Sequence, residues 1–192
     1  KILIDVALGM DFCHRQLPQI IHKDVKSPNV FLSIRRDGLA AAAKDAAAQR
    51  SGGGVLGSPS LQGGPAGGIP GEWLVAKVAD LGLATVLTKL NKDSVVDNPI
   101  WLAPELIRGQ SFDEKIDVYA FGIIMHEVMT LAFPFEERLA HATFMSALAP
   151  EIAQGVRPTP LVVDGLPTPL YSELMQRCWH QDRKERPPFR TV

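Results

Sequence analysis

The sequence lacks the features that mark secreted, membrane-spanning and nucleic-acid-binding proteins. Its 192 residues include two cysteines, Cys13 and Cys178, too few for a disulfide framework or a clustered zinc site. No apolar run reaches 18 residues, so we expect no membrane span within this chain. A net charge of -1 gives no reason to expect a nucleic-acid partner or a membrane-surface partner. These absences favour a reducing, cytoplasmic location, or the cytoplasmic part of a longer chain.

A starting methionine and a signal-peptide layout are missing as well. Asp5 interrupts the first apolar stretch, KILIDVALGM, which has no cleavable leader pattern. The hydrophobic and charged fractions, 46% and 21%, are ordinary for a soluble globular domain. We therefore expect a globular domain that is a piece of a longer protein.

Hydrophobic periodicity predicts a mainly helical, α+β fold. Apolar residues recur at three- and four-residue steps from Leu3 to Leu17, which predicts an amphipathic helix that ends before Pro18. The elements expected after it are a short strand or turn at 20–21, strands at 30–34 and 73–79, a short helix opening at 103–105, a central buried helix at 115–130 and further helices over 136–192.

A compositional break separates the two predicted strands. Seven of the ten residues at 39–48 are alanine, and positions 51–71 hold nine glycines, three prolines and three serines. A Gly/Pro/Ser run cannot bury a core. Because hairpin loops are usually about two to five residues long, we interpret residues 35–72 as a low-complexity, disordered insertion. A spacer is the simplest interpretation, and a docking or regulatory segment is the alternative.

The stretch IIHKDVKSPNVFL, residues 20–32, carries polar residues inside an apolar run, a pattern typical of a functional loop. Asp24, Lys26 and Asn29 are close enough in sequence to converge on one point. The carboxylate can accept a proton from a hydroxyl, the ammonium can hold a phosphoryl oxygen, and the amide oxygen can bind Mg²⁺. Asp80, after the second strand, offers a second metal ligand because the predicted hairpin brings both loops to one edge.

These residues resemble the sequence blocks of the protein kinases, in the family's order. His22 to Asn29 is similar to the catalytic loop H-R-D-L-K-x-x-N, Asp80-Leu81-Gly82 to D-F-G, and Ala103-Pro104-Glu105 to A-P-E. The wording DVYAFG and CW…RPPF is similar to the tyrosine kinase-like group, which includes Raf-like and mixed-lineage kinases. Lys26 follows the serine/threonine pattern.

The resemblance implies transfer of phosphate from ATP to serine or threonine hydroxyls of a protein substrate, with tyrosine as the alternative acceptor. It implies Asp24 as the catalytic base and Lys26 as the group that neutralises the transferred phosphoryl. Asn29 and Asp80 would bind Mg²⁺ and, through it, ATP.

Further residues would support the site by the same resemblance. Glu105 would pair with Arg186, Asp117 would cap the backbone of the catalytic loop, and His22 would be a packed structural residue. Lys23 stands where the family has an arginine. The candidate activation-loop phosphorylation sites, for an upstream activating kinase, are Thr85, Thr88 and Ser94.

Three substitutions and one absence depart from the family pattern. Besides Lys23, Leu81 replaces phenylalanine, and Asn98 stands where serine/threonine kinases usually carry a threonine that bonds the catalytic aspartate. No G-x-G-x-x-G turn and no V-A-I-K-like strand precede the first helix. The resemblance therefore implies a large kinase lobe across residues 1–192, with the small N-terminal lobe absent and the fragment inactive alone. A pseudokinase-like scaffold or interaction module without turnover is the alternative function.

Overall fold

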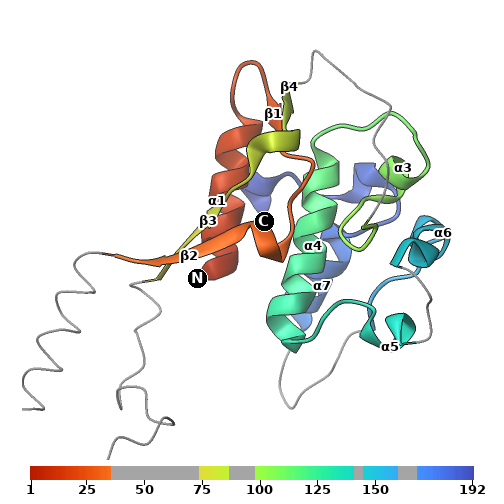
Figure 1. Cartoon of the computed structure of the whole chain (residues 1–192). Coiled ribbons are helices and arrows are strands. Elements are labelled where there is room, and N and C mark those ends of the chain that lie inside the picture. Colours follow the sequence, from red (N-terminus) through yellow and green to blue (C-terminus); the bar gives the residue numbers. More distant parts are fainter. Residues whose placement is uncertain (36–73, 87–97, 141–144, 160–167) are drawn as a thin grey trace, which may run out of the picture.

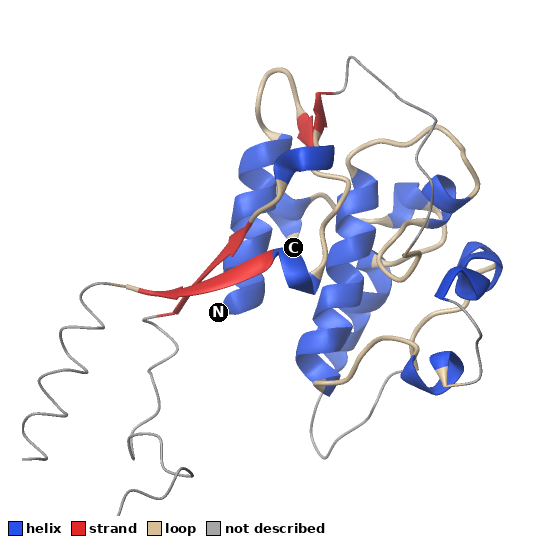
Figure 2. Ribbon diagram, in the orientation of Figure 1, coloured by secondary structure: helices blue, strands red, loops and turns tan. Residues whose placement is uncertain are grey.

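The computed structural model describes residues 1–35, 74–86, 98–140, 145–159 and 168–192. In these ranges the other helices gather around α4 (Lys115–Thr130), which lies at the centre of Figure 1. Helices α1 (Ile2–His14) and α7 (Pro169–Cys178) both contact α4. Figure 2 shows two short two-stranded sheets beside this helical body. The predicted mainly helical fold with a small hairpin is confirmed.

Helix α4 has the bounds that its sequence predicts, because nearly every residue in it is apolar. Eleven consecutive residues, from Ile116 to His126, are buried. At Gly122 the helix approaches α7 so closely that a Cβ atom would lie 3.0 Å from the backbone nitrogen of Trp179. Cys178 and Trp179 are buried in this contact.

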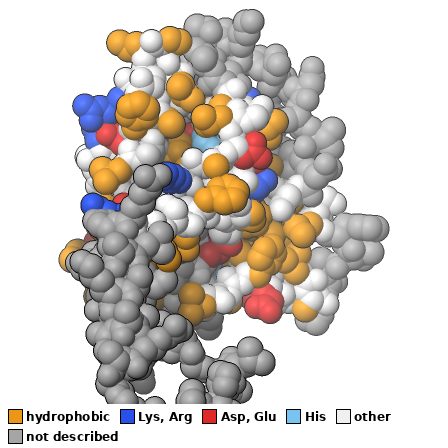
Figure 3. All heavy atoms as spheres, turned by 60° about the vertical axis from the view of Figure 1, so that its left-hand side comes forward, with side chains coloured by type: hydrophobic (Ala, Val, Ile, Leu, Met, Phe, Trp, Pro, Cys, Tyr) orange, Lys and Arg blue, Asp and Glu red, His pale blue; other side chains and the backbone are white. Residues whose placement is uncertain are grey.

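Helix α1 ends earlier than its periodicity predicts. Val6 and Met10 are buried on the inner face, but the helix stops at His14, and Leu17 is 97% exposed. Leu17 precedes a proline, a position at which the helical conformation is disfavoured. The outer face is also apolar, because Ile4, Leu8 and Phe12 are exposed on it. Figure 3, which turns this side of the molecule forward, shows hydrophobic side chains spread over it.

The predicted hairpin consists of β2 (Val30–Ile34) and β3 (Leu74–Val78), which pair antiparallel from Val30↔Val78 to Ile34↔Leu74. A second antiparallel pair joins β1 (Ile20–Ile21) to β4 (Thr85–Val86). Together the two pairs bracket the polar loop 22–29 and the turn at Asp80. The predicted insertion beyond Arg35 lies outside the described residues, as do Thr88 and Ser94.

The remaining helices are short. They are α3 (Pro104–Ile107), α5 (Glu136–Leu139), α6 (Ala149–Ala153) and the 3₁₀ turns η1 (Ser27–Asn29), η3 (Leu81–Leu83), η4 (Met145–Leu148), η5 (Arg183–Glu185) and η6 (Phe189–Thr191). Among the described residues, every helix is too short or too polar to cross a bilayer.

Candidate active site

The loop between β1 and β2 brings Asp24, Lys26 and Asn29 together. The Lys26 Nζ lies 2.8 Å from Asp24 Oδ2, and Asn29 Nδ2 donates to the same oxygen at 2.9 Å. Asn29 Nδ2 also donates to the backbone oxygen of Asp24 at 2.8 Å. Because both contacts use Oδ2, the other carboxylate oxygen of Asp24 accepts no hydrogen bond from the described residues. The side chains of Lys26 and Asp24 are 30% and 20% exposed, so solvent and solutes reach this pair.

His22 ties this loop to the turn at Asp80. The buried imidazole lies with Nε2 3.1 Å from the oxygen of Ala79, while Nδ1 accepts from the amide of Asp24 at 3.3 Å. The neutral tautomer with its proton on Nε2 satisfies both bonds. The backbone amide of Ala79 in turn donates to the backbone oxygen of Asn29 at 2.9 Å. Asp80, the next residue, is therefore held beside the loop.

The turn after β3 exposes the Asp80 carboxylate. Asp80 has a left-handed backbone (φ 66°), and its Oδ1 accepts from the amide of Gly82 at 3.2 Å. A Cβ on Gly82 would lie 3.0 Å from that oxygen, so glycine leaves room for the carboxylate to fold back over the turn.

Asn29 and Asp80 present the oxygen atoms that could hold a magnesium ion. The side-chain nitrogen of Asn29 donates both of its hydrogen bonds to Asp24. The side-chain oxygen of Asn29 receives no hydrogen bond from the described residues. Hard oxygen ligands of this kind suit Mg²⁺, which usually takes one or two protein ligands together with phosphate oxygens. Within the described ranges, no group of three or more His, Cys, Asp or Glu side chains forms a separate metal site.

Asp117, in the first turn of α4, anchors the start of the loop. Its two carboxylate oxygens accept from the amides of His22 and Lys23 at 2.8 and 2.9 Å, and His14 Nε2 lies 2.9 Å from Oδ2. Lys23 has a left-handed backbone (φ 67°), a conformation that costs a non-glycine residue about 1–2 kcal/mol. The buried carboxylate stabilises this conformation, so the loop keeps the shape that brings Asp24 next to Lys26.

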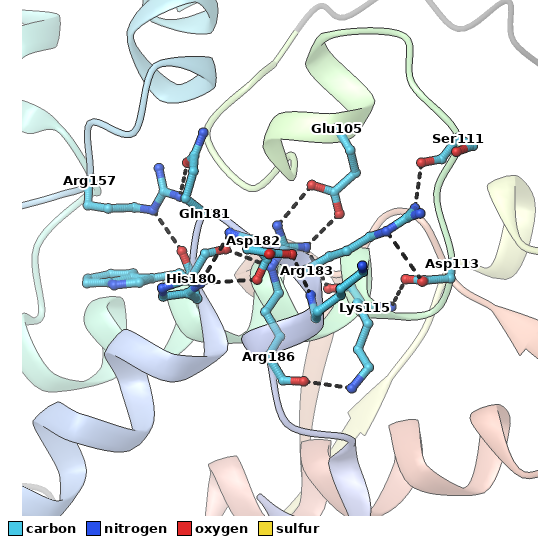
Figure 4. A network of polar contacts seen from close by, with 12 residues as sticks. Glu105, Ser111, Asp113, Lys115, Arg157, His180, Gln181, Asp182, Arg183 and Arg186 are labelled. Carbon is cyan, nitrogen blue, oxygen red and sulfur yellow. Dashed lines mark hydrogen bonds and ion pairs between the residues drawn. The ribbon is translucent and has the colours of Figure 1, made fainter.

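Glu105 and Arg186 form a buried pair distant in sequence, seen at the centre of Figure 4. The guanidinium donates to the two carboxylate oxygens at 2.6 and 2.9 Å, and its Nε donates to the oxygen of His180 at 2.8 Å. The guanidinium carbons of Arg186 and Arg157 lie 5.1 and 4.8 Å from the centre of the Tyr119 ring. Burial raises the pKa of Tyr119 to about 12, so this phenol stays neutral. The pair joins α3 to the end of the chain.

The structure also connects three residues that sequence reasoning did not assign to the site. Glu127, near the end of α4, accepts hydrogen bonds from Ser27 of the loop and from the indole nitrogen of Trp101. A lone carboxylate late in an otherwise apolar helix was the available signal for Glu127.

Asn98, which the resemblance places near Asp24, lines the same small cavity as Asp24. Its side-chain oxygen, however, accepts a hydrogen bond from the amide of Ile100 at 3.3 Å.

At the base of the hairpin, the helical body holds an aspartate beside a lysine and two further side chains with oxygen atoms, an arrangement that suits phosphoryl transfer. The comparison with known families agrees over the full length, since the family "protein tyrosine and serine/threonine kinase" matches residues 1–192. The chain therefore belongs to the protein kinase superfamily, with tyrosine kinase-like character, and the predicted membership is confirmed.

Among curated proteins, the chain is similar to several much longer ones. It is 32% identical, over 100% of its own length, to the probable serine/threonine-protein kinase roco8 of Dictyostelium discoideum, of which it covers 8%. It is 34% identical to roco5 of the same organism over 98% of its length, and 33% identical to cyclic GMP-binding protein C, covering 6% of each. The chain thus spans less than a tenth of these relatives.

Proposed function

We propose that this chain is the large lobe of a protein kinase domain that transfers a phosphoryl group from ATP to serine or threonine hydroxyls of a protein. One observation carries the proposal: Asp24 Oδ2 is bound by both Lys26 and Asn29, which leaves Oδ1 open beside a lysine whose side chain is 30% exposed. That arrangement supplies a proton acceptor and a cation at one point, as phosphoryl transfer requires.

Each side chain has a role in the proposed reaction. Asp24 Oδ1 accepts the proton of the attacking hydroxyl, and Lys26 neutralises charge on the transferred group. Asn29 and Asp80 would hold Mg²⁺, which when bound shields the negative charge of the donor phosphates. His22 and Asp117 keep the loop in shape through its backbone, and the Glu105–Arg186 pair fixes the segment that precedes α4. The acceptor peptide would lie across residues 95–104, of which 95–97 lie outside the described residues.

Activity is tested in the full-length polypeptide, because the curated relatives are more than ten times longer than this chain. We expect Mg²⁺-dependent transfer of labelled phosphate from ATP to a generic acceptor such as myelin basic protein. Asp24→Asn should reduce the rate by about 100-fold or more, since a positioned base contributes about that factor. The control is Glu136→Gln, which also replaces a carboxylate by an amide but on the exposed face of α5 (Glu136–Leu139). It should leave the rate unchanged.

Transfer that survives Asp24→Asn would overturn the catalytic role and support the alternative, a scaffold without turnover. Phosphoamino-acid analysis of the acceptor decides between serine or threonine and tyrosine. Cytoplasmic action belongs to the same proposal, because ATP and a reducing compartment are found there. Phosphorylation of Thr85, Thr88 or Ser94 by an upstream kinase stays a prediction, and phosphopeptide mapping of the active protein checks it.

A further inference from the structure

A carboxylate on α1 is bonded to the strand that leads to Asp80. Asp5 lies in the first turn of α1, inside the apolar stretch that it interrupts in the sequence. Its Oδ2 accepts a hydrogen bond at 3.0 Å from the backbone amide of Ala76, which lies 71 positions further along the chain in β3. An amide has one hydrogen to donate, so that of Ala76 faces the helix and not the partner strand β2. Asp5 therefore fastens β3 to α1 at the middle residue of the strand.

The Asp5 carboxylate is more buried than a surface ion pair requires. Its side chain is 14% exposed, and Ala76 is 5% exposed. The Nζ of Lys1, a residue one helical turn away, lies 2.6 Å from Asp5 Oδ2. Burial acts to raise the pKa of the Asp5 carboxyl, but the hydrogen bonds from Lys1 and from the amide of Ala76 outweigh burial and lower the pKa overall. The group is thus a carboxylate at neutral pH, and its bond to the strand is charge-assisted.

Strand β3 has two neighbours, α1 and β2. Figure 1 shows β3 running alongside α1, against which it packs, and its residues 74–78 pair with β2. Without the carboxylate of Asp5, the amide of Ala76 would be buried and unpaired, which is costly for a backbone donor. The strand would have to shift against α1, or admit water, to pair that amide again.

The two candidate metal ligands are connected to different helices. Asn29 is bonded to Asp24 in the loop that Asp117 anchors on α4. Asp80 follows β3, four residues after Ala76, or about 13 Å along an extended strand. The placement of the two ligands therefore depends on the pairing of β3 with β2 and on where each helix holds its own segment. The bond from Ala76 is a polar contact through which α1 holds β3.

We propose that Asp5 is a positioning residue for the metal site, which fastens β3 to α1 and thereby places Asp80 to bind Mg²⁺ together with Asn29. The inference rests on the proposed kinase function and adds a determinant of metal binding to it. It gives a role to a polar residue that lies outside the candidate site. Asparagine keeps an acceptor oxygen for the amide of Ala76 but lacks the charge that strengthens the bond, whereas alanine has no acceptor.

Metal binding is measured directly, without phosphate transfer. The full-length polypeptide is titrated with Mn²⁺ in the presence of the nonhydrolysable ATP analogue AMP-PNP, and free Mn²⁺ is followed by electron paramagnetic resonance. Asp5→Ala should raise the Kd for Mn²⁺ by about tenfold, the lower end of the loss that follows removal of a residue supporting a metal ligand. Asp5→Asn should raise it less. The KM for myelin basic protein should stay unchanged in both variants, because the loop that carries Asp24 keeps its own anchor on α4.

Two control variants separate the bond to the strand from the charge on the helix. Asp11→Ala removes a carboxylate of similar exposure, 18% against 14%, from the same helix, where it pairs with Arg15 of the next turn. Lys1→Ala removes the ion pair of Asp5 but leaves the bond to Ala76. Neither control should alter the Kd for Mn²⁺.

Two further measurements locate the effect. Hydrogen exchange of the Ala76 amide should be slow in the wild type and faster in Asp5→Ala, because the amide loses its acceptor. Asp80→Asn should weaken Mn²⁺ binding by itself. Asp5→Ala should then add little to that loss, because Asp5 acts on the metal through Asp80.

The inference is overturned if the Kd for Mn²⁺ is unchanged in Asp5→Ala, or if Asp11→Ala raises it equally. It is also overturned if the Kd, the KM and the melting temperature deteriorate together, as a purely structural role requires. Should Asp5→Ala not fold, Asp5→Asn decides by the same criteria.

Failure of this inference is distinguishable from failure of the proposed function. An enzyme that loses transfer in Asp24→Asn but keeps a normal Kd for Mn²⁺ in Asp5→Ala retains the function without this device. A wild type that binds Mn²⁺ with the predicted dependence on Asp5, yet transfers no phosphate, overturns the function alone. A wild type that neither binds Mn²⁺ nor transfers phosphate overturns both.

Discussion

At the residue scale, the Glu105–Arg186 pair offers a direct test of how a buried charge is tolerated. Arg186→Ala leaves the carboxylate of Glu105 buried without its cation, which should lower the free energy of unfolding by about 3–5 kcal/mol. The matched control is Arg138→Ala, which breaks an ion pair to Glu151 whose side chains are 45% and 43% exposed. That change should cost about 0–1 kcal/mol. Chemical denaturation measures both, and equal losses would contradict the prediction.

Glu127 makes stability depend on pH in a defined direction. Burial raises the pKa of its carboxyl above the ordinary 4.5, so the folded protein binds the proton more tightly than the unfolded chain does. The stability contributed by this group is fully present below pH 4.5 and is lost as the pH rises through the folded-state pKa. Glu127→Gln should remove this part of the pH dependence of the free energy of unfolding. Identical pH profiles for the two proteins would contradict the assignment.

The residues of the site differ in how far sequence alone can reveal them. Asp24, Lys26 and Asn29 lie within six positions, so a local pattern with known chemistry brings them together before any fold is considered. Glu127 and Trp101 meet through the crossing of α4 with a distant segment. The late carboxylate marks Glu127 in its helix, but no local pattern names its partner, so only packing reveals the contact with Trp101.

At the element scale, predictability follows the length and regularity of the pattern. The helix 115–130 was predicted with its observed bounds because an apolar run of that length has one stable solution, a buried helix. Helix α1 ends at His14, earlier than its apolar period, which continues to Leu17. The period misleads here because Pro18 disfavours a helical last turn. The pairing of β1 with β4 was not predicted, since strands of two residues carry no periodicity.

Contact between α4 and α7 depends on one glycine. In Gly122→Ala the new Cβ would meet backbone and Cβ atoms of Trp179 and the Cβ of Cys178 at 3.0–3.1 Å, so the helices must separate. We expect a loss of about 1–3 kcal/mol in the free energy of unfolding. Gly9→Ala is the control, because a Cβ at this exposed position of α1 meets nothing within 4 Å. It should stabilise the protein by about 0.5–1 kcal/mol through helix propensity. Two changes of the same sign would contradict the packing argument.

At the scale of the whole molecule, α4 supports the polar loop at two points. Asp117, near its start, binds the amides of His22 and Lys23, and Glu127, near its end, binds Ser27. Ten residues of helix separate the two carboxylates, a rise of about 15 Å. A rigid buried helix therefore fixes both ends of a loop that has little regular structure of its own, and this explains how an irregular segment can hold chemistry in place.

The hairpin gives the proposed domain organisation its own test. Its outermost pair is Ile34↔Leu74, so residues 35–73 can be replaced by Asn-Gly, a connection that suits a two-residue hairpin. If 35–72 is an insertion without a share in the core, closing the shorter loop should raise the free energy of unfolding by about 2.5 kcal/mol, because the loop length is halved about four times and each halving is worth about 0.6 kcal/mol. Phosphate transfer by the full-length polypeptide should not change.

A Gly/Ser segment of the original length, placed between Ile34 and Leu74, is the matched control and should leave both stability and transfer as they were. Because the two strands carry Asn29 and Asp80 at their other end, the hairpin transmits any distortion directly to the candidate metal ligands. A loss of stability in the Asn-Gly variant would therefore mean that the replaced residues pack on the domain. Normal stability with altered transfer in both variants would instead favour a docking or regulatory role for the insertion, the alternative that its composition leaves open.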